Sequence, residues 1–290
     1  MISHAPVMVK EVIGILSPRP GGVYIDATVG PGGHTLEILR HIGSDGKIIG
    51  LDRDTEAINI AQQRITDERV ILVKSLFSEM DKVLIGMGIT GVDGILFDFG
   101  ISMLQVKDME RAFSFSSEYP LDMRMDRSKG ITAEEIVNTY PAKELERILR
   151  EFGEERLAER IARAIVSKRR EGRIRSCKEL ADLVSKVYGR RGKIHPATKT
   201  FQALRIAVNN EINEIREGLQ NSIGLLKKGG RLCVISYHSL EDRIVKNFMR
   251  DSERKGLLRI LTKKPLTPQR EEIRSNPASR SAKLRGAEKI

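Results

Sequence analysis

Three aspartates that follow apolar runs are the first candidates for chemistry in this chain. Asp26 ends VYID and opens the stretch DATVGPGGHT (26–35), Asp52 ends KIIGLD, and Asp98 lies near the end of VDGILFDFG. An apolar run, a glycine-rich turn and a helix-like run predict a strand, a tight turn and a helix start, an arrangement that binds nucleotide-shaped ligands. In open α/β sheets such ligands bind at the carboxyl ends of the strands, where all three carboxylates are expected.

The composition of the turn separates the ligand classes. It contains three glycines, Gly30, Gly32 and Gly33. His34 and Thr35 follow them, so the third glycine of the dinucleotide fingerprint is absent, and so is the lysine of a phosphate-binding loop. The carboxylate of Asp26 suits a cation better than a pyrophosphate, because like charges repel. S-adenosylmethionine, which carries an ammonium and a sulfonium, fits this turn best.

Two further features are compatible with an adenosine ligand. Asp52 follows Gly33 by nineteen residues and can accept hydrogen bonds from both ribose hydroxyls, of NAD or of S-adenosylmethionine alike. The stretch LLKKGGRLCVIS (225–236) is similar to the entry into the fifth strand of class I S-adenosylmethionine-dependent methyltransferases. The three features together favour S-adenosylmethionine.

The elements that position these residues alternate along the first hundred residues. Strands are expected at 23–27, 47–52, 70–74 and 92–100, with helices between them, which predicts an α/β protein with a doubly wound sheet. From Thr132, where a capping box begins, the pattern is helical for about a hundred residues and includes one long tract at 201–226. A fifth strand is expected at 231–239.

The simplest domain organisation is therefore a discontinuous one. A methyltransferase-like domain is expected to comprise residues 1–114 and 211–290, with an all-helical domain inserted at 115–210. The tail after Lys263 is rich in Pro, Ser and Arg and is expected to be poorly ordered unless a partner holds it.

Composition and charge indicate the class of partner. The 290 residues contain no apolar run long enough for a membrane span, and the amino terminus does not have the pattern of a secretory signal. Cys177 and Cys233 offer neither a disulfide framework nor metal-ligand spacing, so an intracellular protein without a metal is expected. The net charge is +11: residues 168–193 carry +7, residues 251–290 carry +6, and the rest of the chain carries about −2. Two basic zones on a near-neutral body favour a polyanionic partner, nucleic acid.

Longer motifs make the resemblance specific. In order along the chain stand SHAPVMVKEV (3–12), DATVGPGGHT (26–35), LDRD (51–54), DFGIS (98–102), FSF with PLDMRMD (113–126), HPATKTFQALRIAVNNE (195–211), ISYHSLEDRIVK (235–246) and NPASRSAKLR (276–285). With them the chain closely resembles the bacterial 16S ribosomal RNA (cytosine-N4)-methyltransferase family, nearly end to end. The resemblance implies methylation of a cytidine amine in the decoding region of 16S ribosomal RNA, with naked RNA or the small ribosomal subunit as substrate. It also implies a cytoplasmic enzyme, and it leaves a homodimer open.

The resemblance also implies which residues hold the cofactor. Together with Asp26 and Gly30 of the turn, these are Gly32, Gly33, His34, Asp52, Phe77, Asp98 and Gln105. The glycines would let the backbone approach the methionine part and Asp52 would take the ribose, whereas Phe77 could stack on adenine or belong to the core. Many amine methyltransferases carry a D/N/S-P-P-Y/F element after the fourth strand. This chain has DFGIS there instead, so the amine-binding geometry of those enzymes cannot be transferred to it.

Four residues are expected near the target base. Asp98, Ser102 and His238 are candidate catalytic residues: Asp98 could accept a hydrogen bond from the amine, and His238 could take a proton or hold the SYHSLED turn. Tyr237 could stack on an extruded base or fill the core. The expected phosphate contacts are Arg169, Arg170, Arg173, Arg175, Arg190, Arg191 and Lys193 in the inserted module, and Arg280, Lys283 and Arg285 in the tail. Aromatic residues are scarce, so recognition of a folded shape is favoured over a stacking platform.

Three other functions remain open from the residues. A nicotinamide-dependent oxidoreductase conflicts with the missing third glycine. A ribosome-assembly factor without catalysis conflicts with the intact acidic set. Methylation of cytosine in DNA agrees with the basic charge, and only the family resemblance favours RNA.

Overall fold

The computed structural model describes residues 6–189 and 195–290 and divides the chain into two compact units. The first comprises the residues up to Gly100 together with Ile212–Ile290, and the second comprises Ile101–Glu211. The expected boundary after residue 114 falls inside the second unit, because this unit already begins at Ile101, directly after the strand expected at 92–100.

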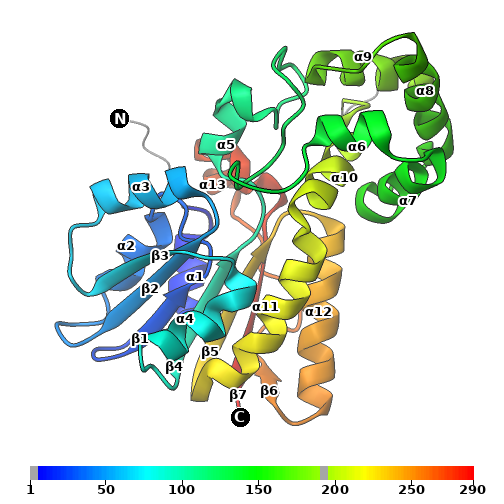
Figure 1. Cartoon of the computed structure of the whole chain (residues 1–290). Helices are drawn as coiled ribbons and strands as arrows, with labels where there is room; N and C mark the ends of the chain where they lie inside the picture. The colour runs from blue at the N-terminus through cyan, green and yellow to red at the C-terminus, as the bar shows by residue number, and fades with distance from the viewer. Residues whose placement is uncertain (1–5, 190–194) are drawn as a thin grey trace. The chain divides into compact units, whose positions relative to one another are not determined.

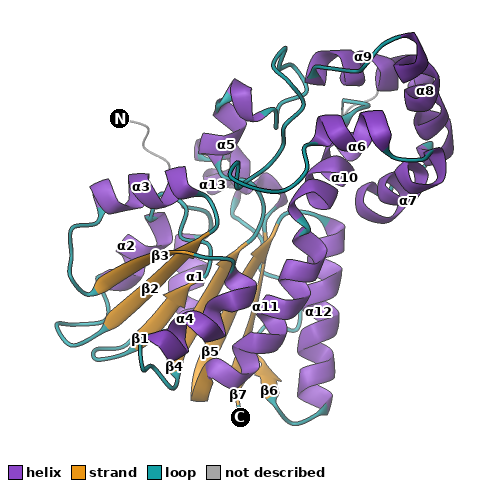
Figure 2. Cartoon of the chain, in the orientation of Figure 1, coloured by secondary structure: helices purple, strands orange, loops and turns teal. Residues whose placement is uncertain are grey.

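The first unit is built on a seven-stranded sheet with helices on both faces (Figure 2). Its strands are β1 (Val23–Asp26), β2 (Lys47–Asp52), β3 (Val70–Lys74), β4 (Val92–Asp98), β5 (Leu226–Ser236), β6 (Leu258–Ile260) and β7 (Lys283–Lys289). Their order is β3-β2-β1-β4-β5-β7-β6. The first five strands are parallel, and β7 runs antiparallel to both β5 and β6. The predicted doubly wound class I methyltransferase sheet is confirmed.

Side-chain alternation along the central strands explains why both faces are covered. On β4, Ile95 and Phe97 contribute to one hydrophobic core and Leu96 to the other. On β1, Tyr24 and Ile25 divide in the same way. Because successive side chains of a strand point to opposite faces, a strand buried on both faces must be apolar almost throughout. That requirement is why VDGILFD reads as a continuous apolar run.

The helices of this unit complete the two cores. On one face pack α4 (Met80–Gly86), α11 (Glu211–Leu225) and α12 (Ser239–Arg254), and on the other pack α1 (Val9–Leu16) and α2 (Gly33–Leu39). The expected N-cap of α3 (Thr55–Arg64) is confirmed, since the Asp54 side chain accepts a hydrogen bond from the Glu56 N–H. The 3-10 helix η1 (Phe77–Glu79) follows β3.

The sheet also corrects the expectation for the tail. The chain after Lys263 forms α13 (Arg270–Ser275), the 3-10 helix η3 (Pro277–Ser281) and β7, and β7 lies between β5 and β6. Leu284 and Ala287 are fully buried there. The expectation of a poorly ordered tail is wrong, because Leu284 and Ala287 of β7 pack into the cores on the two opposite faces of the sheet.

The second unit is helical, as expected, around a core of its own (Figure 1). Its helices are α5 (Met103–Lys107), α6 (Ala133–Thr139), α7 (Ala142–Gly153), α8 (Ala158–Glu171), α9 (Cys177–Tyr188) and α10 (Thr198–Asn209), with the 3-10 helix η2 (Met109–Arg111). The capping box at Thr132 and Glu135 is confirmed. The single helical tract expected at 201–226 is wrong, because Asn210 adopts a left-handed φ of 51° and separates α10 from α11.

Within residues 6–189 and 195–290, no helix is long and apolar enough to cross a membrane.

Candidate active site

The glycine turn between β1 and α2 has the backbone that its composition predicts. Gly30 and Gly32 have positive φ values of 50° and 85°, a region that side-chain-bearing residues rarely adopt. A Cβ on Gly32 would lie 2.4 Å from Ile65 Cδ1, and a Cβ on Gly33 would lie 3.1 Å from Pro6 Cβ. The glycines therefore allow the turn to pass close to neighbouring side chains.

Asp52 lies at the carboxyl end of β2 and is tied to this turn. Its Oδ2 accepts a hydrogen bond from the Gly30 N–H at 2.9 Å, and its Oδ1 accepts one from the Asp54 N–H at 2.9 Å. Desolvation by burial raises the pKa of Asp52 to about 6, against the lowering effect of the two amides. A carboxylate with lone pairs left over and a desolvated setting is suited to accept hydrogen bonds from neutral hydroxyls.

Asp26 ends β1 and is almost completely buried, with 1 % of its surface exposed. The Thr35 hydroxyl donates a hydrogen bond to Asp26 Oδ2 at 2.7 Å, so the first turn of α2 holds the carboxylate. Burial raises the pKa of Asp26, and the neighbouring His34 and the hydroxyl oppose that shift. The sequence pattern identified Asp26 but missed Thr35, although both belong to DATVGPGGHT.

Asp98, at the carboxyl end of β4, is the meeting point of three segments of the chain. The Tyr237 hydroxyl donates to Asp98 Oδ1 at 2.8 Å, and His34 Nε2 lies 3.5 Å from Asp98 Oδ2. The Asp98 N–H donates to Thr28 Oγ1 at 2.7 Å, which fixes the end of the strand against the start of the glycine turn. The β1 and β4 strands are adjacent where the strand order reverses, which is where open α/β sheets bind ligands.

The electrostatics of this group follow from its burial. Burial acts to lower the pKa of His34, but Asp98 and Asp26 outweigh it and the pKa of His34 is raised. Burial and the Asp98 carboxylate raise the pKa of Tyr237 well above its ordinary value, so the phenol stays protonated and keeps donating. His34 Nδ1 is buried and finds no hydrogen-bond partner among the described residues.

Tyr237 packs its ring against the core, which is one of the two roles weighed for it from the sequence, and its hydroxyl makes a further contact. Its ring is partly buried against the core of the first unit that contains Leu96 and Leu284. A Cβ on Gly100 would lie 3.3 Å from Tyr237 Cδ2. Its hydroxyl is committed to Asp98. The structure thus joins two sequence-predicted site residues that are 139 positions apart, through a contact that no local pattern indicates.

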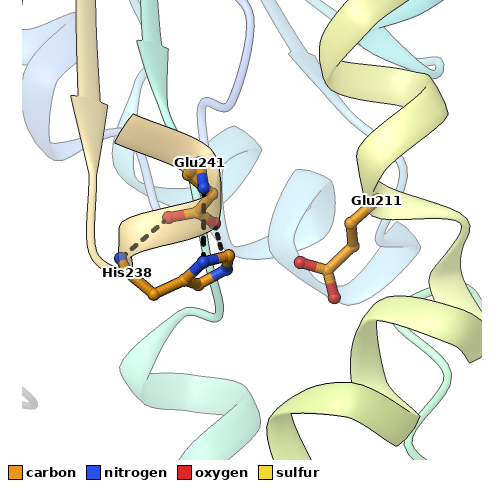
Figure 3. Close-up of side chains that lie close together, drawn as sticks. All are labelled: Glu211, His238 and Glu241. Atoms are coloured by element: carbon orange, nitrogen blue, oxygen red, sulfur yellow. Dashed lines mark hydrogen bonds and ion pairs between the residues drawn. The ribbon is translucent and has the colours of Figure 1, made fainter. Parts of the chain in front are cut away.

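His238 is placed at the N-cap of α12, folded back on its first turn (Figure 3). Its Nδ1 accepts from the Glu241 N–H at 3.3 Å, and the Glu241 carboxylate accepts from the N–H groups of Tyr237 and His238. His238 Nε2 lies 3.1 Å from Glu241 Oε1. This capping box orients the turn that carries Tyr237, which agrees with the structural role weighed for His238.

Glu211, also drawn in Figure 3, is counted with the second unit. There Arg205 Nε and Nη2 donate to its two carboxylate oxygens at 2.9 and 2.8 Å.

Phe77 lies in η1 after β3, within a cluster of three phenylalanines. Its ring meets Phe97 edge-on at a centroid distance of 5.5 Å and lies 5.8 Å from Phe99. A Cβ on Gly218 would lie 2.6 Å from Phe77 Cδ2, so α11 passes directly against the ring. Phe77 lies at the edge of the core and stays partly exposed. One part of its ring packs against the core, and the exposed part remains open to a ligand.

Ser102 and Gln105 belong to the second unit, where they cap α5 together. The Gln105 N–H donates to Ser102 Oγ, and the Ser102 N–H donates to Gln105 Oε1. This reciprocal pair is a capping box, so both side chains have a clear local role.

The basic residues expected to meet phosphates have different settings in the structure. Arg169 Nη1 donates to the carbonyls of Val137 and Tyr140 at the end of α6, whereas Arg170 is exposed. Arg173 is exposed and lies 3.2 Å from Glu134. Arg190, Arg191 and Lys193 lie outside the described residues.

The tail arginine Arg285 corrects a further expectation. It is buried and its Nε donates to Asp242 Oδ1 at 2.7 Å. The predicted phosphate contact by Arg285 is wrong, because this ion pair attaches β7 to α12.

Taken together, the first unit offers a site that fits S-adenosylmethionine. The glycine turn permits close backbone approach, Asp52 presents an acceptor, and His34 Nδ1 is a buried polar atom that a ligand can satisfy. Two carboxylates, of Asp26 and Asp98, lie near one another around His34 and favour a cationic ligand.

Comparison with known proteins supports the same conclusion. The model of the MraW methylase family matches residues 1–290. The Ribosomal RNA small subunit methyltransferase H of Persephonella marina is 50% identical over 295 residues, and that of Caldicellulosiruptor bescii is 46% identical over 307; both alignments cover 100% of each chain. A crystal structure of a Clostridium thermocellum protein, 16% identical with a TM-score of 0.50 and complete coverage of both chains, shares the fold. The resemblance drawn from the motifs is confirmed, and the chain belongs to the MraW methylase family.

Proposed function

We propose that this chain transfers a methyl group from S-adenosylmethionine to the exocyclic N4 amine of a cytidine in the decoding region of 16S ribosomal RNA. Membership of a methylase family and relatives named as small-subunit ribosomal RNA methyltransferases support the reaction and the substrate class. The observation that carries the proposal is the Asp98 carboxylate, which Tyr237 and His34 hold at the strand-order reversal beside the glycine turn.

The cofactor is assigned to the first unit. Asp52 would accept hydrogen bonds from the ribose hydroxyls, Gly30, Gly32 and Gly33 would let the backbone approach the methionine part, and His34 Nδ1 would pair with a polar group. Phe77 would offer a ring for adenine, and Gln105 is a cofactor contact that only the family resemblance implies. When bound, the cofactor supplies a methyl group activated by the positive sulfonium.

The chain's own contribution is to orient the amine and receive its proton. The N4 amine is a weak nucleophile because its lone pair is delocalised into the ring. Asp98 would accept a hydrogen bond from N4–H and turn the nitrogen towards the methyl group. As the N–C bond forms, the bond from the methyl group to sulfur would break with its electron pair left on sulfur, and the N4 proton would pass to this carboxylate. Tyr237 holds Asp98 Oδ1, so that the carboxylate keeps one orientation.

The other two candidate catalytic residues receive supporting roles. His238 caps α12 and fixes the turn that carries Tyr237, which makes it a positioning residue. Ser102, which follows Asp98 by four residues in the sequence, caps α5 and holds Gln105.

The inserted module, predicted at 115–210, is assigned to RNA. Arg170 and Arg173 are exposed on it and supply phosphate contacts, together with Arg169, Arg190 and Arg191. Such contacts position an RNA without specifying its sequence. The proposal places the enzyme in the cytoplasm and leaves a homodimer open; a homodimer would show by light scattering twice the 32.6 kDa mass of one chain.

The experiment that tests the proposal measures transfer of a labelled methyl group. The protein is incubated with labelled S-adenosylmethionine and, in parallel, with small ribosomal subunits from cells lacking the enzyme, naked 16S ribosomal RNA, and double-stranded DNA. Label in the ribosomal RNA of one of the first two samples, and none in DNA, is the expected result. An Asp98→Asn variant, which keeps the size of the side chain, is expected to lose transfer even at S-adenosylmethionine concentrations that saturate its cofactor site.

The alternatives predict different results in the transfer experiment and in measurements of subunit and cofactor binding made beside it. A ribosome-assembly factor would bind subunits without transferring label. A DNA methyltransferase would label DNA, and an oxidoreductase would bind a nicotinamide cofactor in preference to S-adenosylmethionine. Each of these three results would overturn the proposal.

A further inference from the structure

The second unit exposes large apolar side chains in one short segment. Two of the eight exposed large hydrophobic residues among the described residues are the aromatic Phe115 and Tyr119, four positions apart. Phe115 is 37% exposed and Tyr119 is 48% exposed. Single exposed apolar residues are common, but aromatic rings gathered on a connecting segment indicate a binding surface.

Phe115 is held in a fixed orientation by two other rings. The imidazole of His195 is stacked on it, with centroids 4.3 Å apart and an angle of 5° between the planes. Phe201 of α10 meets Phe115 edge-on at 6.1 Å and 85°. His195 is fixed in turn, because its Nδ1 accepts from the Ala197 N–H at 3.2 Å and its carbonyl accepts from the Thr198 N–H at 3.0 Å. Phe115 and His195 are both exposed and thus form a preformed pair of stacked rings, whose imidazole can receive a further ring on its other face.

Basic residues lie next to this segment. The Leu121 N–H donates to the Arg175 carbonyl at 3.1 Å, and the Lys178 N–H donates to the Ser117 carbonyl at 3.0 Å. Residues 117–121 therefore lie beside residues 175–178, at the start of α9, and Arg173, Arg175 and Lys178 are exposed on this stretch. Arg173 pairs with Glu134 and Lys178 pairs with Glu118, so a phosphate would compete with these carboxylates. Rings and cations on one surface are the combination that binds unpaired nucleotides, since bases stack on rings and phosphates pair with cations.

We propose that the Phe115–His195 pair is a stacking site for an unpaired base of the RNA substrate, with the neighbouring arginines on its phosphates. The inference rests on the proposed function, because it takes the partner to be RNA. It also replaces the expectation of recognition by shape alone. That expectation arose because Phe115 and His195 are far apart in the sequence and only the fold brings them together.

The test compares ring-preserving with ring-removing substitutions. Binding to small ribosomal subunits from cells lacking the enzyme is measured for Phe115→Leu, Phe115→Trp and His195→Ala. Ile131→Ala is the matched control, an exposed apolar residue of the same unit without a ring. S-adenosylmethionine affinity and thermal melting of each variant confirm that both units remain folded.

The stacking site predicts a specific pattern. Phe115→Leu and His195→Ala weaken subunit binding by about tenfold, which is within the range for loss of one base stack, whereas Phe115→Trp and Ile131→Ala bind as the wild type does. The salt dependence of binding keeps its slope in all four, because no phosphate contact is removed.

Two results would overturn the inference and are distinguishable from each other. If the wild type methylates ribosomal RNA and Phe115→Leu binds within twofold of it, the rings serve only the packing of the unit and the proposed function stands. If the wild type methylates no ribosomal RNA, the proposed function fails and this inference fails with it.

Discussion

The carboxylate of Asp98 illustrates how a residue at a strand end acquires a fixed orientation. Its own strand determines where the side chain begins, but Tyr237, Thr28 and His34 determine how Asp98 is held. A hydrogen bond from a neutral phenol leaves the negative charge in place, which a proton acceptor requires. Tyr237 is therefore a positioning residue rather than a catalytic one.

Replacing Tyr237 with Phe is expected to lower kcat for methyl transfer about tenfold or more, because the Asp98 carboxylate loses the donor that orients it. Affinity for S-adenosylmethionine and KM for the RNA substrate should stay within about twofold of the wild type. Steady-state kinetics and calorimetry measure these quantities. Tyr119→Phe, which removes an exposed hydroxyl, is the control; an unchanged kcat in Tyr237→Phe would contradict the positioning role.

The raised pKa of Asp52 predicts a pH dependence of cofactor binding. The ribose hydroxyls require the ionised carboxylate, and the free protein is protonated at this group below its pKa of about 6. Affinity is therefore full above pH 7 and falls as the pH drops through 6, to about tenfold weaker at pH 5. Calorimetric titration from pH 5 to pH 8 measures the profile.

Asp52→Asn separates this effect from the titration of His34, whose pKa is also raised. The variant should bind weakly at every pH and should lose the step near pH 6. If the step persists in Asp52→Asn, another group is responsible for it.

At the scale of elements, the stability of the fold should depend on β7, which attaches the carboxyl-terminal part of the chain to the sheet. Leu284 is fully buried within it, so Leu284→Ala is expected to reduce the free energy of unfolding by about 2–5 kcal/mol. Leu266→Ala, an exposed position of the same tail, should change it by less than about 1 kcal/mol. Denaturant titration measures both, and equal small effects would show that the tail is not part of the folded sheet.

The elements differ in how well the sequence predicts them, for physical reasons. The strands ending at Asp26, Asp52 and Asp98 were predictable because a parallel strand buried on both faces is a continuous apolar run followed by a turn. β7 was not, since an antiparallel strand that pairs with β5 across a Pro- and Arg-rich segment has no such local pattern. The break at Asn210 depends on one backbone angle within a continuous helical pattern.

The site divides in the same way. Asp26, the glycines and Asp52 were predictable because the turn chemistry is local. The Tyr237–Asp98 hydrogen bond and the Phe115–His195 stack were not, because each joins residues that are close only in the fold.

At the scale of the whole molecule, the excess positive charge predicts salt-dependent binding of RNA. Arg170→Glu with Arg173→Glu should weaken binding to small ribosomal subunits, and the slope of log affinity against log salt should decrease by about one for each lost phosphate contact. Cofactor affinity should not change. Lys10→Glu, an exposed charge reversal in the first unit, is the control, and an unchanged slope in the double variant would remove these arginines from the RNA contact.

The central claim is methyl transfer to a cytosine amine, and the identity of the product nucleoside tests it most directly. Ribosomal RNA from subunits treated with the protein and S-adenosylmethionine is digested to nucleosides, which are separated against authentic methylcytidine standards and fragmented in a mass spectrometer. The account predicts one modified nucleoside that co-migrates with N4-methylcytidine and carries the methyl group on the base. A methyl group on the ribose, on a ring carbon or on another base would contradict it.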